Sequence, residues 1–114
     1  MKISRIINLL EAKVVTQNDF ADREITKAFS SDLMSDVLTL DEENILLISG
    51  LANIQLIRTA EMAEIHVVVL ARGKKASPDM IQLANENHLV LIETPRSIFG
   101  AGGILFSNGL KPVY

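Results

Sequence analysis

The chain has 114 residues, of which 48% are apolar, and a formal net charge of −3; this length and composition suit one folded domain covering residues 1–114 and exclude a disordered chain. The acidic balance, with basic residues scattered along the chain, argues against a general nucleic-acid-binding surface. The chain contains no cysteine, which excludes disulfides, thiolate zinc sites and cysteine-ligated iron–sulfur clusters and is compatible with a cytoplasmic protein.

The first part of the chain predicts an amphipathic helix followed by less regular segments. Ile3, Ile6 and Leu10 recur at helical spacing and give the opening helix its apolar face. Further along, Ser30 and Ser31 precede a second helical pattern, and serine is a good cap because its oxygen accepts an orphan backbone N–H. The expected elements are a helix over 3–12, a short strand over 13–16, a loop over 17–22, a strand over 24–29 and a helix over 32–39.

Residues 45–71 read as one strand–helix–strand unit, around which the rest of the chain is organised. Two continuous apolar runs, 45–48 and 66–70, enclose a glycine turn and an apolar helical pattern over 54–63 that Asn53 can cap. Strands without polar alternation are typical of a parallel sheet that helices cover on both faces.

The last part of the chain continues the alternation of helix and strand. Ser77 and Thr94 each precede a proline, which combines a capping side chain with a residue suited to the first helical position. Helices are therefore expected from Pro78 and over 95–107, with a strand over 89–92 between them. Alternating strands and helices predict right-handed parallel crossovers. The expected fold is a three-layer, Rossmann-like α/β domain with a mainly parallel sheet of four or five strands.

The candidate binding residues follow from this fold, because open α/β sheets bind ligands beyond the carboxyl ends of their strands. Gly50 and Asn53 place free backbone N–H groups at a helix start, which suits a phosphate or another small anion. In the simpler alternative, Gly50 only permits a tight turn and Asn53 only caps the helix. The candidates at this edge are Ser31, Asp32, Gly50, Asn53, Arg72, Gly73 and Thr94.

No motif in the sequence predicts catalysis, a bound metal or a cofactor. His66 and His88 lack a carboxylate or histidine partner at metal-binding spacing, and no serine lies in a nucleophile elbow. The glycine-rich run 100–103 matches neither a dinucleotide fingerprint nor a P-loop, and we expect it to serve close packing against the sheet or a second subunit. No apolar run approaches the ~20 residues that span a bilayer, so no membrane partner is expected.

A family resemblance rests on short segments spread over about residues 10–109. These segments are Asp22-Arg23-Glu24-Ile25, residues 31–38, Ile48-Ser49-Gly50, residues 57–61, Ala71-Arg72-Gly73-Lys74, Leu83-Ala84 and Glu93-Thr94. Together they resemble the DRTGG domain family. The family's Asp-Arg pair is absent after Gly50, and only the last glycine of its Thr-Gly-Gly is present, as Gly73. With Asn53, these two glycines are the site residues that carry over.

The resemblance implies a Rossmann-like regulatory domain that forms homodimers and has no catalytic activity. Such domains are attached to CBS-domain pyrophosphatases and to phosphotransacetylases, and are similar to the N-terminal domain of HPr kinase. Stand-alone bacterial members occur alongside iron–sulfur hydrogenase systems.

Two functions are therefore expected for this chain. The first is a regulatory, ligand-sensing homodimer that binds a small anionic molecule, such as a nucleotide, at the strand ends. The alternative is an interaction module that docks on a partner enzyme, for instance in an iron–sulfur hydrogenase system, through Phe99 and Phe106 on the last helix. An enzyme that uses Asp32, Arg72 and Thr94 is not expected, because no general base among them has a positioned partner.

Overall fold

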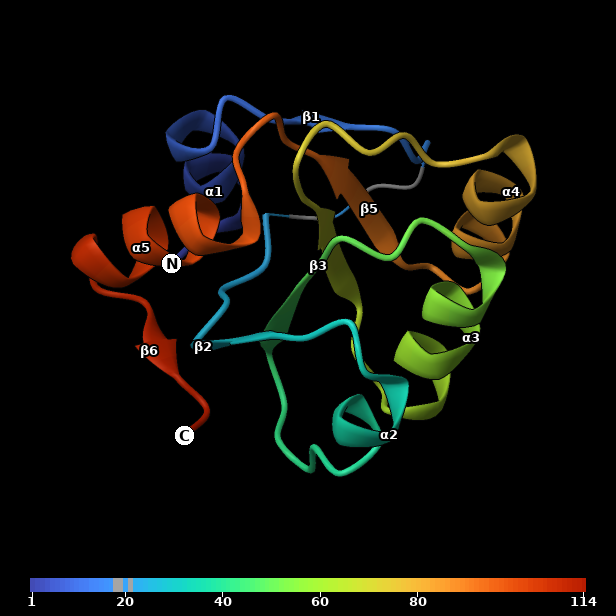
Figure 1. The fold of residues 1–114 in the computed structure, drawn as a ribbon, viewed down its shortest axis with the longest axis horizontal. Coiled ribbons are helices and arrows are strands. Elements are labelled where there is room, and N and C mark those ends of the chain that lie inside the picture. The colour runs from blue at the N-terminus through green and yellow to red at the C-terminus, as the bar shows by residue number, and fades with distance from the viewer. Residues whose placement is uncertain (18–19, 21) are drawn as a thin grey trace.

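The computed structural model describes residues 1–17, 20 and 22–114, which form the alternation of helices and strands that the sequence predicts (Figure 1). The elements are α1 (Ile3–Leu9), β1 (Lys13–Val14), β2 (Lys27–Ser30), α2 (Met34–Val37), β3 (Ile45–Ser49), α3 (Ile54–Met62), β4 (Val67–Leu70), α4 (Pro78–Glu86), β5 (Val90–Glu93), α5 (Ile98–Ser107) and β6 (Lys111–Pro112). The expected loop over 17–22 lies partly outside the described residues.

The described strands form one sheet with the order β1-β5-β4-β3-β2-β6. Strands β2 to β6 run parallel to their neighbours, and β1 runs antiparallel to β5. This topology confirms the mainly parallel, Rossmann-like α/β fold. A sixth strand, β6, adds to the four or five expected. Its two residues are too few for a periodic signal, and Pro112, which cannot donate a backbone hydrogen bond, fits only at such an edge.

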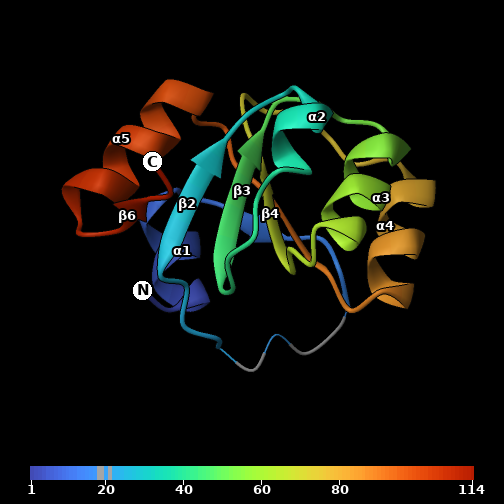
Figure 2. The same ribbon diagram turned by 90° about the horizontal axis from the view of Figure 1, so that it is seen from below.

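Helices cover both faces of the sheet, as the unbroken apolar strands predict (Figure 2). From β2 to β5 the chain moves one strand along the sheet at each crossover, so right-handed connections place α2, α3 and α4 on the same face. After β5 the chain turns to the other face, where α5 lies beside α1 and returns the chain to β6 at the far edge. All residues of β3 and β4 are buried between these two layers.

The prediction of a helix over 95–107, capped by Thr94, is wrong at its start. The helix begins at Ile98, and Ser97 is its cap. Thr94 is instead buried, and its hydroxyl donates a hydrogen bond to the Leu10 carbonyl oxygen at 2.7 Å. The local pattern of cap and proline does not reveal that a carbonyl group 84 residues away accepts this hydrogen bond.

The helix predicted over 32–39 is also too long. In the structure it is α2, which has four residues, and no side chain caps its start. Ser31 accepts a hydrogen bond from the Leu33 N–H at 3.0 Å and so forms a tight turn before the helix rather than a cap. In contrast, Asn53 and Ser77 cap α3 and α4 as predicted.

Candidate functional site

The carboxyl ends of the parallel strands lie at one edge of the sheet, and the segments that leave β2, β3, β4 and β5 meet there. All seven residues predicted from the sequence lie on these segments, but they form two groups. Ser31, Asp32, Gly50 and Asn53 follow β2 and β3, whereas Arg72, Gly73 and Thr94 follow β4 and β5.

In the first group, Asp32 joins the ends of β2 and β3. Its Oδ1 accepts a hydrogen bond from the Ser49 hydroxyl at 2.7 Å and another from the Gly50 N–H at 2.7 Å. The oxygen of Ser49, which is buried, also accepts from the Leu51 N–H at 3.2 Å. Side chains of the chain itself therefore hold the turn that leads from β3 into α3.

This arrangement weakens the case for an anion at the start of α3. The Gly50 N–H, which is the donor expected to hold a phosphate, already binds a carboxylate whose negative charge repels a second anion. Asn53 Oδ1 accepts from the Leu56 N–H at 3.1 Å and caps the helix, as in the simpler alternative. The side chains of the first group therefore mainly stabilise the turn between β3 and α3, and they occupy N–H donors that a ligand would need.

In the second group, the backbone of Arg72 and Gly73 bonds to the segment that follows β5. Both residues have left-handed backbone angles, with φ of 60° and 69°. This turn directs the Arg72 N–H to the Arg96 carbonyl oxygen at 2.6 Å and the Gly73 N–H to the Thr94 carbonyl oxygen at 2.9 Å. Arg72 is one of six described non-glycine residues with a positive φ, so its backbone angle shapes this turn but does not by itself mark a functional residue. The Arg72 side chain is left exposed.

The chain leaves β4 and β5 toward opposite faces of the sheet, because β4 leads to α4 and β5 leads to α5. Two such strands form a topological switch point, which is where open α/β sheets bind ligands. A cavity of about 290 Å³ opens at this point. It is lined by Glu11, Ala12, Lys13, Gly73, Lys75, Glu93, Thr94 and Pro95.

Glu93, the last residue of β5, is a residue of this cavity that sequence reasoning missed. Its carboxylate is buried, with Oε2 accepting from the Ala76 N–H at 2.8 Å and Oε1 from Lys75 Nζ at 3.4 Å. It thereby fixes the segment after β4 against the end of β5. A signal existed, since an acid that ends an apolar strand must find donors when it is buried, but the sequence does not say which donors.

The lining of the cavity is balanced in charge, with two lysines and two glutamates, whereas the segments that carry the lining hold more cations than carboxylates. Glu93 pairs with Lys75, and Glu11 pairs with Arg96 at 3.2 Å. The Nε of Arg96 is buried and has no hydrogen-bond partner among the described residues. Three further cations of these segments make no ion pair within 4.0 Å in the described part of the chain: Lys13, Arg72 and Lys74. The surplus of positive charge therefore lies on the residues next to the lining and not in the lining itself, on a chain whose net charge is −3.

Both histidines are exposed, His66 before β4 and His88 after α4. Within residues 1–17, 20 and 22–114, no group of three or more histidine and acidic side chains is arranged to hold a metal ion. No helix in the same part of the chain has the length and apolar character needed to cross a membrane.

The fold and its strand-end edge thus define a Rossmann-like α/β protein. No protein-family model and no curated protein matches the amino-acid sequence. Among solved structures, the chain is similar to the CBS and DRTGG domains of the regulatory region of Clostridium perfringens pyrophosphatase, in a complex with its activator, diadenosine tetraphosphate. The TM-score is 0.78 at 18% sequence identity, over 90% of this chain and 45% of that chain.

This likeness shows that the chain shares the fold of part of that region, and it supports the resemblance to DRTGG domains predicted from the sequence. The chain matches less than half the length of the pyrophosphatase region. The bound activator is therefore a property of that protein.

Proposed function

We propose that this chain is a non-catalytic regulatory module that senses a small anionic molecule, such as a nucleotide, and acts as a homodimer of single-domain chains. The observation that carries the proposal is the cavity between the ends of β4 and β5, which coincides with the topological switch point and is lined by segments that carry more cations than carboxylates. The shared fold with a regulatory region that binds a nucleotide activator supports the same role. The expected cytoplasmic location stays a prediction.

The residues proposed to contact the anion are Lys13 and Lys75 from the lining of the cavity and Arg72 from the turn beside it. Gly73, also predicted from the sequence, shapes this turn, because its N–H already donates to the Thr94 carbonyl oxygen. The backbone of the turn is held by the segment after β5, so the cationic side chains are the groups left to bind a phosphate.

The size of the cavity limits what it can hold. At about 290 Å³, it lies at the lower end of the ~300–1,000 Å³ typical of small-molecule sites. We therefore propose that it takes the phosphate part of a mononucleotide, with the base outside, rather than a whole dinucleotide.

Isothermal titration calorimetry with AMP, ATP and diadenosine tetraphosphate tests this site. A chain that carries both Lys13→Ala and Arg72→Ala should bind at least roughly tenfold more weakly, which corresponds to about 1.4 kcal/mol. Arg58→Ala removes an exposed cation from α3 and serves as the matched control. No heat of binding from any of the three compounds, or an equal loss in the control, would contradict the proposal.

The alternative function, docking on a partner enzyme, is favoured by the apolar outer face of α5. Phe99 and Phe106 are both exposed on that helix. This surface does not overlap the lining of the cavity, so a partner that docks there would leave the anion site free.

A further inference from the structure

The outer face of α5 is unlike the outer faces of α3 and α4. Both of those helices carry charged residues toward solvent, whereas α5 has no charged residue and only Ser107 as a polar side chain. Phe99 is 90% exposed and Phe106 is 65% exposed. They lie seven residues apart and therefore on one face of the helix. A helix that is apolar on every side is typically covered on every side.

Gly102 and Gly103 occupy the centre of this face without a packing reason inside the chain. A Cβ at Gly103 would meet nothing within 4 Å, and one at Gly102 would meet only Ser30 Oγ, at 3.9 Å. Glycine is less favourable than alanine in a helix interior, so these two glycines make α5 less stable than alanines would. The expected close packing against the sheet does not account for these two glycines, whereas a second chain that approaches the helix closely does.

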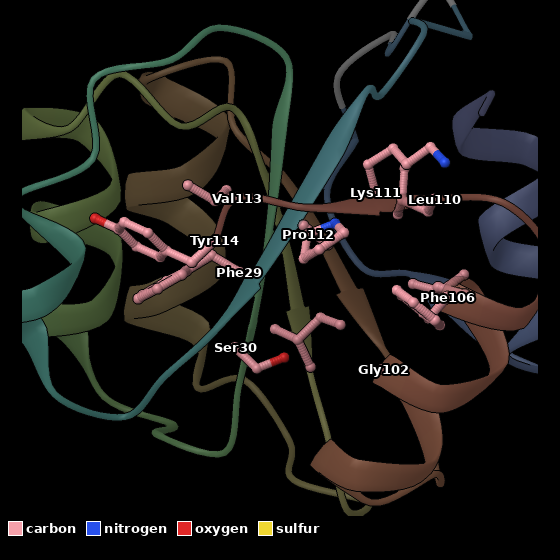
Figure 3. A pocket seen from close by; sticks show the side chains of 12 residues that line it. Phe29, Ser30, Gly102, Phe106, Leu110, Lys111, Pro112, Val113 and Tyr114 are labelled. Atoms are coloured by element: carbon pink, nitrogen blue, oxygen red, sulfur yellow. The ribbon is translucent and has the colours of Figure 1, made fainter.

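The neighbouring edge of the sheet is open as well. Strand β6 pairs only with the first two residues of β2, so residues 29–30 have no strand on that side in the described part of the chain. A cavity of about 270 Å³ lies along this edge. Figure 3 shows Gly102 and Phe106 on one side of it and Tyr114 near Phe29 on the other. Tyr114 is 84% exposed and meets the Phe29 ring edge-on, with centroids 6.0 Å apart. An open edge of this kind is usually covered.

We propose that this α5 flank binds a second copy of the chain, with two α5 helices crossing at their glycines about a two-fold axis. The flank consists of Phe99, Gly102, Gly103, Phe106, Pro112 and Tyr114. The inference rests on the homodimer proposed above and not on the anion site.

The spacing on α5 is what identifies the partner as a second copy. Phe99 and Phe106 are each three residues from the nearer glycine of the central pair, so the pattern reads the same from both ends. In an antiparallel crossing with two-fold symmetry, Phe99 of one protomer lies beside Phe106 of its partner, and the reverse contact forms at the same time. The glycines then allow the two backbones to approach closely.

The exposed area agrees with what a stable dimer needs. Phe99, Phe106 and Tyr114 together expose roughly 500 Å² per protomer, if each aromatic side chain contributes ~200 Å² when fully exposed. A standard interface buries about 800 Å² per partner, and in homodimers about 65% of it is apolar. Phe99 and Phe106 supply roughly 300 Å² of this apolar area. Tyr114, on the other side of the cavity along this edge, supplies most of the rest when the partner also covers that cavity.

Sedimentation equilibrium over a range of protein concentrations tests the proposal, with circular dichroism to confirm that each variant is folded. Wild-type chain should be dimeric, and Phe99→Glu and Phe106→Glu should each raise the dimer dissociation constant at least 100-fold. Met62→Glu is the matched control, because Met62 is 61% exposed on α3 and lies outside the flank. A monomeric wild type, or phenylalanine variants that dimerise as well as the control, would overturn the proposal.

Gly103→Ala tests the crossing point. In the Phe99→Glu background the alanine should raise the thermal midpoint, because it stabilises the helix and meets no neighbour. In the wild-type background it should weaken the dimer, because its Cβ separates the two helices. An unchanged or tighter dimer would rule out a crossing at the glycines. Nucleotide calorimetry on Phe99→Glu keeps the two proposals separate, since a monomer that still binds the anion shows that the sites are independent.

Discussion

The two halves of the strand-end edge look equivalent in the sequence but differ in the structure. At the ends of β2 and β3, the Asp32 carboxylate takes the Gly50 N–H and the Ser49 hydroxyl, so an internal anion occupies the place where a ligand was predicted. At the ends of β4 and β5, the backbone groups bond to each other, and three cations, Lys13, Arg72 and Lys74, make no ion pair in the described part of the chain. A helix start is thus an anion site only when the protein does not supply the anion itself.

The path of the chain explains the difference. The connections after β2 and β3 both turn toward α2 and α3 on one face, so no crevice opens between them. The connections after β4 and β5 turn to opposite faces, and the cavity lies where they separate. The position of the proposed site therefore follows from the return of α5 across the other face of the sheet.

In this comparison, the largest loss of stability is expected from Thr94→Val, in the β4–β5 half. Thr94 is 1% exposed, and its hydroxyl donates to the Leu10 carbonyl and accepts from the Arg96 N–H. Valine keeps the shape but leaves both groups without their partner, which should lower the free energy of unfolding by about 1–3 kcal/mol. Urea denaturation measures the loss, and Thr94→Ser, which keeps the hydroxyl, is the control. A valine variant as stable as wild type would show that this hydroxyl does not secure the end of α1.

A smaller effect is expected from Asp32→Ala in the β2–β3 half. The substitution removes the acceptor of two hydrogen bonds, but Asp32 is exposed and water can replace part of the loss, so about 1 kcal/mol of stability should disappear. Asp36→Ala, at an exposed position on α2, should change stability by less than about 0.5 kcal/mol. Nucleotide affinity should be unchanged in both variants. A marked fall in affinity for Asp32→Ala alone would move the proposed site to this half.

The smallest effect on stability is expected from the Asp22 carboxylate, which lies away from the strand-end edge and serves as a reference for both halves. The Ser4 N–H donates to Asp22 Oδ1 at 2.9 Å and lowers the pKa of Asp22 below its ordinary 3.8. Partial burial opposes this shift, while the Ser4 hydroxyl and the Lys2 charge add to it. Because the folded pKa is lowered, the stabilisation is present above the ordinary pKa and is lost as the pH falls through the lowered one.

Asp22→Asn should therefore lower the thermal midpoint at neutral pH, and the difference from wild type should shrink toward zero in strong acid. Asparagine suits the left-handed backbone at this position, where φ is 46°, so the comparison isolates the charge. A difference that does not depend on pH would mean that the Asp22 carboxylate does not act through its charge.

Much of the fold was predictable from local patterns. The apolar runs that became β3 and β4 are buried on both faces, and Asn53 and Ser77 cap their helices. Predictions failed where the structure gives a side chain another role, as for Thr94, whose hydroxyl donates to the distant Leu10 carbonyl and accepts from the Arg96 N–H in a turn before the helix. The candidate site was predicted only to the level of the sheet edge. Its division into two halves depends on Asp32 and Glu93, whose partners lie 17 or 18 residues away.

The sequence by itself determined the order of the elements and the parallel sheet, because apolar periodicity and helix caps are properties of neighbouring residues, and it led to the edge proposed for a ligand. Only the tertiary structure decided which part of that edge is open. Lys13 stands beside Glu93 through the antiparallel pairing of β1 with β5, and Asp32 meets Gly50 through the register of β2 on β3. Such contacts depend on how strands that are far apart in the chain align, and no local sequence pattern predicts that alignment.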